Sequence, residues 1–310
     1  MDYKQRTLKD DVGCTGLGLH SGEKIRINIK PAPCGTGIRF VRTDMPASVI
    51  DARFDNVFDT TLATSIGSNG CRVGTIEHLM AAFYGLGIDN ARVELDGPEV
   101  PIMDGSSAPF VYLLKSAGIK EQPEPKKFIV VKKTFKLDDG ERSIHVYPSK
   151  NLKISYMIDF QHPLLRNQEY ELCFSGDDFI REISRARTFG FLKDVQTLKE
   201  NGFARGGSLD NAVVIDDFRI LNEDGLRYKD EFVRHKILDF IGDLSLSQFP
   251  VIGHFVVKKS GHFLNQKMLT KLMASKKHWK VLSFGTPEEC TRNSFTIPAF
   301  GLPELAAQTF

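Results

Sequence analysis

The stretch EFVRHKILDFIGDL, Glu231–Leu244, determines much of the fold that this sequence predicts. Its apolar residues recur at the spacing of one helical face, so we expect a helix that packs against a core. Asp230, immediately before the stretch, belongs to the residue types that cap helices. The apolar positions are Val233, Ile237, Ile241 and Leu244.

A second, polar stripe runs along the same helix. His235, Asp239 and Asp243 stand four residues apart and therefore project in one direction, nearly opposite to the apolar face. Phe232 and Leu238 flank this stripe, so it is not a simple solvated face. A buried ionisable group needs a partner, because leaving it unpaired is costly. We expect that partner to be a salt bridge, a hydrogen-bonded side chain or a metal ion.

The bulk composition indicates a globular protein with room for two ordinary domains. The chain has 310 residues, of which 41% are hydrophobic and 26% charged. Its formal charge of +2 is too balanced to predict a nucleic-acid partner. The polar N-terminus lacks the apolar core of a signal peptide, and no apolar run approaches the ~20 residues of a membrane span. We therefore expect a cytoplasmic protein.

The cysteines are widely scattered, and none forms the CxxC pair of a structural zinc site or a redox motif. We expect reduced thiols, as in a cytoplasmic protein. Any bound metal must then be held by histidine, aspartate or glutamate. The five cysteines are Cys14, Cys34, Cys71, Cys173 and Cys290.

Strand and helix patterns occur on both sides of one linker candidate. Lys120–Lys127 (KEQPEPKK) is charged, carries two prolines and separates segments of roughly 120 and 180 residues. We expect an α+β protein in which each half is a sheet covered by helices. Strands are expected at Lys24–Ile29, Ala91–Leu95, Phe128–Val131, Lys153–Ile158 and Ile252–Val257, and further helices at Ile76–Tyr84, Ala108–Ala117 and Asn265–Ser275.

A weak internal repeat relates the two halves. Glu77–Gly85 (EHLMAAFYG) and Arg234–Gly242 (RHKILDFIG) share the frame H-x-x-x-x-F-x-G, and each precedes a strand and then a helix. If the repeat reflects a duplication, a pseudo-twofold axis would bring His78 and His235 face to face. That geometry favours one shared site between the two domains.

The spacing H-x-x-x-D points His235 and Asp239 the same way, as two ligands of a tetrahedral ion would be. A hydrogen bond between the two side chains is the commoner reason for this spacing. His78 is the strongest candidate for a third ligand. Glu77, beside it, could take a proton from a water that a metal activates. Alternatively, Glu77 favours a helix N-terminus and His78 is an ordinary polar residue.

His262, in KKSGH, follows an expected strand in a loop, where Gly261 allows the backbone to approach a ligand closely. As an imidazolium it could protonate an amine leaving group. Asp243, one turn beyond Asp239 on the helix, could orient it and raise its pKa. The alternative is a surface loop histidine.

Three further features carry weaker signals. In Arg187–Phe191 (RTFGF), Thr188 offers a hydroxyl beside Phe189 and Phe191, and the β–α–β excursion that follows could line an apolar channel or belong to the core. Lys236 could meet an anion such as phosphate or simply be exposed. His20 lies in the glycine-rich stretch TGLGLHSG, which favours a tight turn and could lie near a ligand.

Several stretches together resemble the zinc-dependent UDP-3-O-acyl-N-acetylglucosamine deacetylases of lipid A biosynthesis. The similarity runs from residue 5 to about residue 262, and the combination is highly specific. The stretches are QRTLK (Gln5–Lys9), TGLGLHSG (Thr15–Gly22), TIEHLMAA (Thr75–Ala82), PIMDGSSAPFVYLL (Pro101–Leu114), ISRARTFGF (Ile183–Phe191), NEDGLRYKDEFVRHKILDFIGDL (Asn222–Leu244) and KSGH.

The resemblance implies a catalytic zinc whose ligands are His78, His235 and Asp239. Glu77 would be the general base that activates water against the acetamide carbonyl. The zinc and the Thr188 hydroxyl would stabilise the oxyanion. His262, oriented by Asp243, would be the acid for the departing amine or an electrostatic stabiliser. The products would be acetate and the free amine, in the committed step of the pathway.

The resemblance also implies the substrate contacts. Lys236 would lie near the diphosphate or the sugar of UDP-3-O-acyl-N-acetylglucosamine. The remaining substrate-binding residues would be Leu62, Phe189, Phe191 and Gly207 around the acyl chain, Asp159 and Phe160 at the uridine, and His20.

The implied fold consists of two similar two-layer α/β sandwich domains packed through their helices. Residues 1–122 would form the first, with a β insert near 40–72, and residues 123–310 the second, with a βαβ insert near 188–215. We expect a monomer without a transmembrane segment, with at most transient proximity to a membrane.

Two stretches depart from the family, and both leave the acyl-chain preference open. Thr61–Gly74 (TLATSIGSNGCRVG) is less family-like, and Asn211 stands where many relatives have cysteine. Two other functions are weighed against the deacetylase. One is a catalytically silent module that binds a nucleotide sugar or a protein in the same cleft. The other is a metal-dependent hydrolase of another amide or of a phosphoester.

Overall fold

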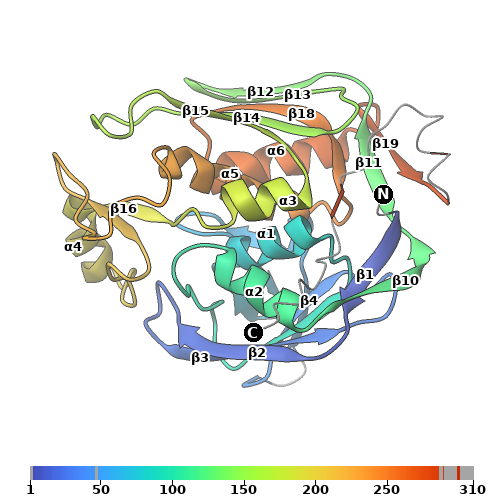
Figure 1. Cartoon of the computed structure of the whole chain (residues 1–310), viewed down its shortest axis with the longest axis horizontal. Coiled ribbons are helices and arrows are strands. Elements are labelled where there is room, and N and C mark those ends of the chain that lie inside the picture. Colours follow the sequence, from blue (N-terminus) through green and yellow to red (C-terminus); the bar gives the residue numbers. More distant parts are fainter. Residues whose placement is uncertain (1–2, 46–47, 286–288, 290–298, 301–310) are drawn as a thin grey trace, which may run out of the picture.

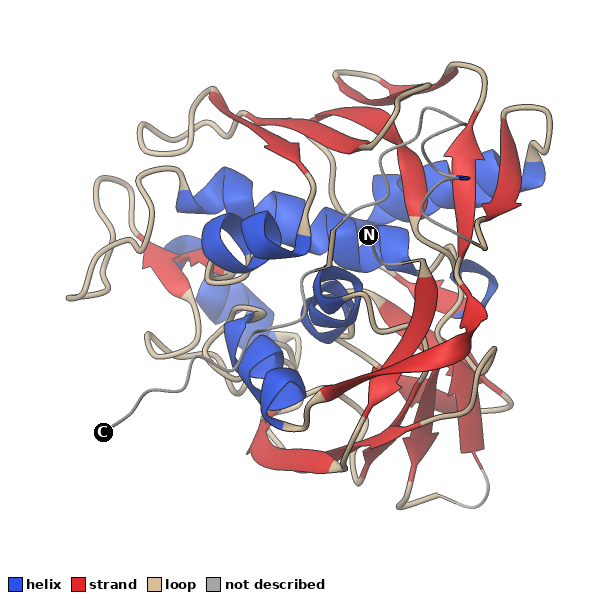
Figure 2. Ribbon diagram, turned by 45° about the vertical axis from the view of Figure 1, so that its right-hand side comes forward, coloured by secondary structure: helices blue, strands red, loops and turns tan. Residues whose placement is uncertain are grey.

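The computed structural model describes residues 3–45, 48–285, 289 and 299–300. It confirms the α+β class, because two β-sheets enclose the longer helices, one above and one below them in the view of Figure 1. The same layering appears in Figure 2, where helices lie between the sheets. The end of the predicted second domain, residues 301–310, lies outside the described residues, as does Cys290.

The lower sheet is built from the N-terminal part of the chain. Ile25, Ile27 and Ile29 alternate along one strand and are fully buried, which explains why this segment forms a strand with one face on the core. In spatial order the strands are β2 (Val12–Leu17), β3 (Lys24–Pro31), β9 (Ala91–Leu95), β4 (Ile38–Arg42) and β5 (Ser48–Asp51).

The upper sheet is built from the C-terminal part and shows the same alternation, with every second residue of Leu152–Ile158 buried. One path through it runs β12 (Phe135–Asp139), β13 (Arg142–Tyr147), β18 (Val251–Lys258), β11 (Lys127–Val131) and β19 (Trp279–Ser283). Off this path, β18 also pairs with β14 (Leu152–Ile158), which pairs with β15 (Gln168–Cys173).

Between the sheets lie the helices α1 (Glu77–Leu86), α2 (Ala108–Ser116), α5 (Glu231–Ser245) and α6 (His262–Ala274). The order α1–β9–α2 recurs as α5–β18–α6, in agreement with the internal repeat. Shorter helical segments are η1 (Phe54–Asn56), α3 (Gly176–Asp178) and η2 (Phe179–Ile183).

Two small sheets lie outside this sandwich. One consists of β6 (Val57–Asp59), β7 (Ser65–Ser68) and β8 (Cys71–Val73). The other pairs β16 (Phe189–Phe191) in parallel with β17 (Val213–Ile215), joined through α4 (Leu192–Glu200), at the left of Figure 1. The segment taken as a linker is not irregular: it forms most of β10 (Ile119–Pro125), which pairs with β1 (Lys4–Leu8).

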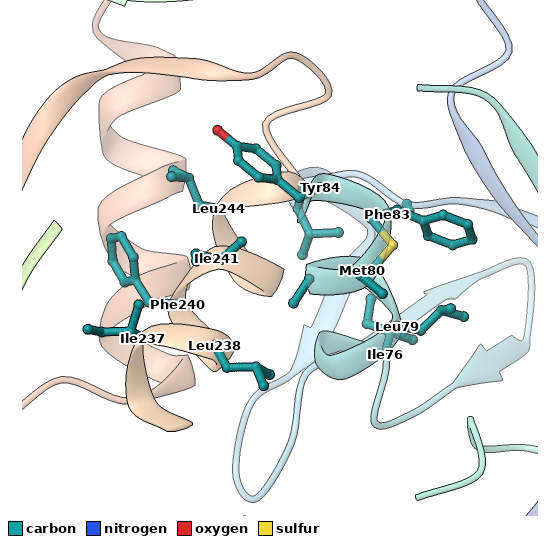
Figure 3. Packing of buried hydrophobic residues seen from close by; sticks show 14 of the residues in the cluster. Ile76, Leu79, Met80, Phe83, Tyr84, Ile237, Leu238, Phe240, Ile241 and Leu244 are labelled. Carbon is teal, nitrogen blue, oxygen red and sulfur yellow. The ribbon is translucent and has the colours of Figure 1, made fainter. Parts of the chain in front are cut away.

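The apolar stripe and the polar stripe of α5 are both buried, as the sequence predicts. Its four apolar positions are at most 1% exposed, and the polar stripe of His235, Asp239 and Asp243 is at most 3% exposed. Figure 3 shows Leu238 and Ile241 on the side of α5 that faces α1, and Ile237 and Phe240 on the opposite side. Asp230 does not cap the helix with its side chain, because its carboxylate binds Arg234 at 2.6 Å instead.

Gly242 allows α1 and α5 to approach closely. A Cβ atom at this position would lie 2.2 Å from the backbone oxygen of Glu77, which is too short for any real contact. Since Glu77 begins α1, the separation of the two helices at this point is set by the absence of a side chain.

No helix in the described part of the chain is both long and apolar enough to cross a membrane. Among the cysteines that the structure describes, Cys14, Cys34, Cys71 and Cys173 are free thiols.

We expect Gly242→Ala to lower the free energy of unfolding by about 1–3 kcal/mol, because the added methyl group must push α1 away from α5. Thermal unfolding measures this change. Gly190→Ala is the matched control, because a Cβ atom there meets nothing within 4 Å. Equal melting temperatures for Gly242→Ala and the wild-type protein would contradict the close approach.

Candidate active site

His78, His235 and Asp239 meet between α1 and α5. The imidazole rings of the two histidines lie 5.1 Å apart, centroid to centroid, as the pseudo-twofold argument predicts. One ligand atom from each of the three side chains lies within 4.8 Å of the others. Asp239 Oδ1 is 3.3 Å from His235 Nε2 and 3.6 Å from His78 Nε2. All three residues are at most 4% exposed, so they form a buried cluster of potential ligands.

The cluster fits a divalent cation by its donor chemistry. Asp239 Oδ1 is buried without a hydrogen-bond partner in the described part of the chain. His235 Nδ1 lies 3.1 Å from the carbonyl oxygen of Ala186, which makes Nδ1 the protonated nitrogen and leaves a lone pair on Nε2. Burial lowers the pKa of His235 to about 3, so the ring is neutral at pH 7. Two imidazole nitrogens and one carboxylate oxygen form a common ligand set for zinc.

Lys236 lies beside the cluster. Its Nζ is 2.7 Å from Asp239 Oδ2, whereas His78 and His235 approach the other oxygen, Oδ1. Burial opposes ionisation of Asp239, but charged neighbours, the ammonium group of Lys236 among them, hold the pKa of this carboxyl well below its usual range. Asp239 is therefore an anion at neutral pH, with one oxygen neutralised by Lys236 and the other available to a cation.

Glu77 begins α1, next to His78, and its carboxylate points into the same site. Its Oε2 accepts a hydrogen bond of 3.1 Å from the backbone N–H of Thr64, and its Oε1 lies 3.8 Å from His262 Nε2. Burial raises the pKa of Glu77, with Asp239 and Asp243 adding to this rise. A carboxylate with a raised pKa is a better proton acceptor, as general-base catalysis requires.

His262 occupies the first position of α6, so the expectation that it lies in a strand-end loop is wrong. Its Nδ1 is 3.0 Å from Asp243 Oδ2, and its Nε2 faces the site, 3.9 Å from Asp239 Oδ2. Burial opposes protonation, but the carboxylate of Asp243, together with Glu77 and Asp239, raises the pKa of His262 to about 9. The ring therefore carries a proton at neutral pH.

These side chains open into a cavity of about 1030 Å³. Many of the residues singled out in the sequence line it: His20, Leu62, Glu77, His78, Asp159, Phe160, Thr188, Phe189, His235, Lys236, Asp239 and His262. Three do not. Asp243 lies behind His262, Phe191 packs against Phe160 with ring centroids 6.1 Å apart, and Gly207 lies near the side chain of Leu19.

Thr188 and Phe189 are held on the edge of the cavity by contacts from both halves of the chain. The Thr188 N–H donates to the carbonyl oxygen of Gly105 at 2.8 Å, and its carbonyl accepts from Val213. Phe189 packs edge-on against Phe232 and His235, with centroid distances of 5.0 and 6.2 Å. The βαβ segment therefore places an apolar wall directly beside a candidate metal ligand.

The structure adds cavity residues that the sequence reasoning missed. Arg142 and Lys259 line the cavity, and Lys259 Nζ bonds to Asp159 and Glu141 at 2.9 and 3.0 Å. Lys259 lies three residues before His262 in the KKSGH stretch, so a basic residue near the site was visible in the sequence. Glu99 does not line the cavity, and no sequence pattern pointed to it, but its buried carboxylate accepts hydrogen bonds from the backbone N–H groups of His20 and Ser21 and from the Thr75 hydroxyl.

Comparison with known proteins identifies the family. The model of the family described as UDP-3-O-acyl N-acetylglycosamine deacetylase matches residues 5–274, most of the chain. The chain belongs to this family.

Relatives named UDP-3-O-acyl-N-acetylglucosamine deacetylase are similar to the chain over nearly its whole length. The protein of Myxococcus xanthus is 54% identical over 281 residues, 90% of each chain. That of Shewanella violacea is 49% identical over 299 residues, covering 95% of this chain and 97% of its own. That of Acidithiobacillus ferrooxidans is 51% identical over 284 residues, covering 91% and 93%.

We expect the cluster to bind one divalent metal ion per chain, and zinc is the ion to test. Asp239→Ala and His78→Ala should each weaken zinc binding by more than about 100-fold, since loss of an outer-shell partner alone typically costs 10–100-fold. Zinc content after dialysis against a competing chelator measures the effect. His254→Ala is the control, because His254 lies on β18 and bonds to Ser155 away from the cavity. Full zinc retention by both cluster variants would exclude this cluster as the metal site.

Proposed function

We propose that the protein is a zinc-dependent deacetylase that hydrolyses the N-acetyl group of UDP-3-O-(3-hydroxyacyl)-N-acetylglucosamine and releases acetate, the committed step of lipid A biosynthesis. Membership of the family and the names of the relatives support this substrate. The observation that carries the mechanism is the buried cluster of His78, His235 and Asp239, with Glu77 and His262 facing it.

In this mechanism the chain supplies a base and an acid on the same side of the metal ligands. Zinc bound at the cluster would supply Lewis-acid chemistry, polarising a carbonyl and lowering the pKa of water. Glu77, with its raised pKa, accepts the proton of the attacking water. His262 holds a proton on Nε2, within 4 Å of Glu77, and gives it to the departing amine. The Thr188 hydroxyl stabilises the developing oxyanion.

The cavity wall matches the parts of this substrate. Lys236 and Lys259 place ammonium groups where a diphosphate or sugar oxygen can meet them. Phe160 offers a ring for uridine, with Asp159 next to it. The remaining proposed contacts are Leu62, Phe189, Phe191 and Gly207 for the acyl chain, and His20.

The expected setting follows from the substrate and the sequence. We propose that the protein works as a monomer in the cytoplasm, the compartment that contains its UDP-linked substrate. Transient proximity to a membrane is also proposed. No nucleic-acid partner is expected.

The decisive assay is acetate release from UDP-3-O-acyl-N-acetylglucosamine. Protein from which a chelator has removed the metal should be inactive, and stoichiometric zinc should restore turnover. Glu77→Gln should keep its zinc but lose at least about 100-fold in kcat, because general-base catalysis typically contributes 10²–10⁴-fold. Glu171→Gln serves as the control, because Glu171 lies on the edge strand β15, away from Glu77, and the kcat of this variant should be unchanged.

Three outcomes would contradict the proposal in different ways. Ligand binding without acetate release, unaffected by chelation, would indicate a silent binding module. Zinc-dependent hydrolysis of a different amide or phosphoester would indicate another hydrolase. Unchanged turnover in Glu77→Gln would remove Glu77 as the base while leaving the activity in place.

A further inference from the structure

Thr64 connects the two halves of the active site without lining its cavity. It is 2% exposed and immediately precedes β7, in one of the less family-like stretches of the sequence. Its backbone N–H donates to Glu77 Oε2 at 3.1 Å, and its carbonyl accepts from the N–H of Ile76 at 3.2 Å. The backbone of Thr64 therefore holds both the start of α1 and the carboxylate of Glu77.

The side chain of Thr64 reaches across to the other half of the chain. Its Oγ1 lies 2.5 Å from Asp243 Oδ1 and 3.2 Å from His262 Nδ1. The second oxygen of Asp243 accepts from Asn265 at 2.8 Å and lies 3.0 Å from His262 Nδ1. Asp243 thus has one oxygen on the Thr64 hydroxyl and the other shared between Asn265 and His262.

This arrangement determines which nitrogen of His262 carries a fixed proton. The hydroxyl of Thr64 has a single proton, which points to the carboxylate of Asp243 because that carboxylate can only accept. Both atoms near His262 Nδ1, the hydroxyl oxygen and Asp243 Oδ2, are then acceptors. Nδ1 must therefore be the N–H donor, and Nε2 is left as the nitrogen that exchanges its proton with the site.

We propose that Thr64 is a positioning residue of the deacetylation reaction, an inference that rests on the proposed function. Its N–H aims the carboxylate of Glu77, and its hydroxyl aims Asp243 so that His262 presents Nε2 to the leaving group. One residue of the N-terminal half thereby fixes the base and the acid relative to each other. Asn265, itself bonded to Ser260 at 2.6 Å, holds Asp243 from the other side.

Three variants test the hydroxyl. Thr64→Val keeps the shape and the backbone N–H but leaves Asp243 Oδ1 without its donor, so kcat should fall about 10–100-fold, the usual effect of losing an outer-shell partner. KM should stay within about twofold, because Thr64 does not line the cavity. Thr64→Ser, which retains the hydroxyl, should restore most of kcat. Thr7→Val is the matched control, a buried threonine whose hydroxyl bonds far from the site, to the carbonyl of Asn90.

A second measurement does not need turnover. In protein labelled with ¹⁵N-histidine, the Nδ1–H resonance of His262 is identified by its absence from His262→Ala. It should be retained in Thr64→Ser and displaced or broadened in Thr64→Val, with zinc content and melting temperature recorded for each variant. Thr7→Val should leave the resonance unchanged even if it lowers the melting temperature.

The inference fails if Thr64→Val keeps the kcat and the His262 resonance of the wild-type protein, or if Thr64→Ser is as impaired as Thr64→Val. Failure of the proposed function is a separate result. A wild-type protein that releases no acetate would remove the reaction, while the resonance would still report whether Thr64 orients His262.

Discussion

The close approach of α1 to α5 is the constraint on which the rest of the site depends. The two helices come from different halves of the chain and can meet only because Gly242 has no side chain to strike the backbone of Glu77. This contact places His78 beside His235 and brings Glu77 within reach of His262. The packing of apolar helix faces therefore brings the catalytic side chains together. The hydrophobic effect drives this packing through the buried apolar area, and the polar side chains on the same helices are positioned as a consequence.

Those polar groups impose a second requirement, which is charge balance inside a buried site. Three carboxylates, Glu77, Asp239 and Asp243, lie at most 4% exposed in one region. Lys236 and the imidazolium of His262 compensate two negative charges, and burial raises the pKa of Glu77. The Asp239 oxygen that faces the two histidines remains without a donor in the described part of the chain. A divalent cation bound here would satisfy this oxygen and both imidazoles together.

Periodicity along single helices was predictable from sequence. The internal repeat also predicted that His78 and His235 meet, but other contacts between distant segments were not predictable. The spacing of His235, Asp239 and Asp243 gave a buried stripe because an α-helix fixes side-chain direction locally. The strand in the Lys120–Lys127 segment was not predicted, since its pairing depends on residues at the N-terminus. The positioning role of Thr64 could not be predicted from the sequence. Its importance comes from a hydroxyl that meets a helix 179 positions away, and no local pattern records such a contact.

The cavity is lined by charged side chains in one part and by an aromatic ring in another, which favours a ligand that has both a charged part and an apolar part. Arg142 and Lys259 bring positive charge, screened by Glu141 next to Lys259, where a polar charged group can be held. Phe189 instead brings an aromatic face up to the candidate metal ligand His235. An acylated sugar nucleotide places a diphosphate, an amide and a hydrocarbon chain within one molecule, so it can meet both kinds of wall while the amide lies at the base and the acid. A small phosphoester would leave the apolar wall in contact with water, and a plain lipid amide would make no use of the charged side chains of the cavity; both are therefore poorer partners for this cavity.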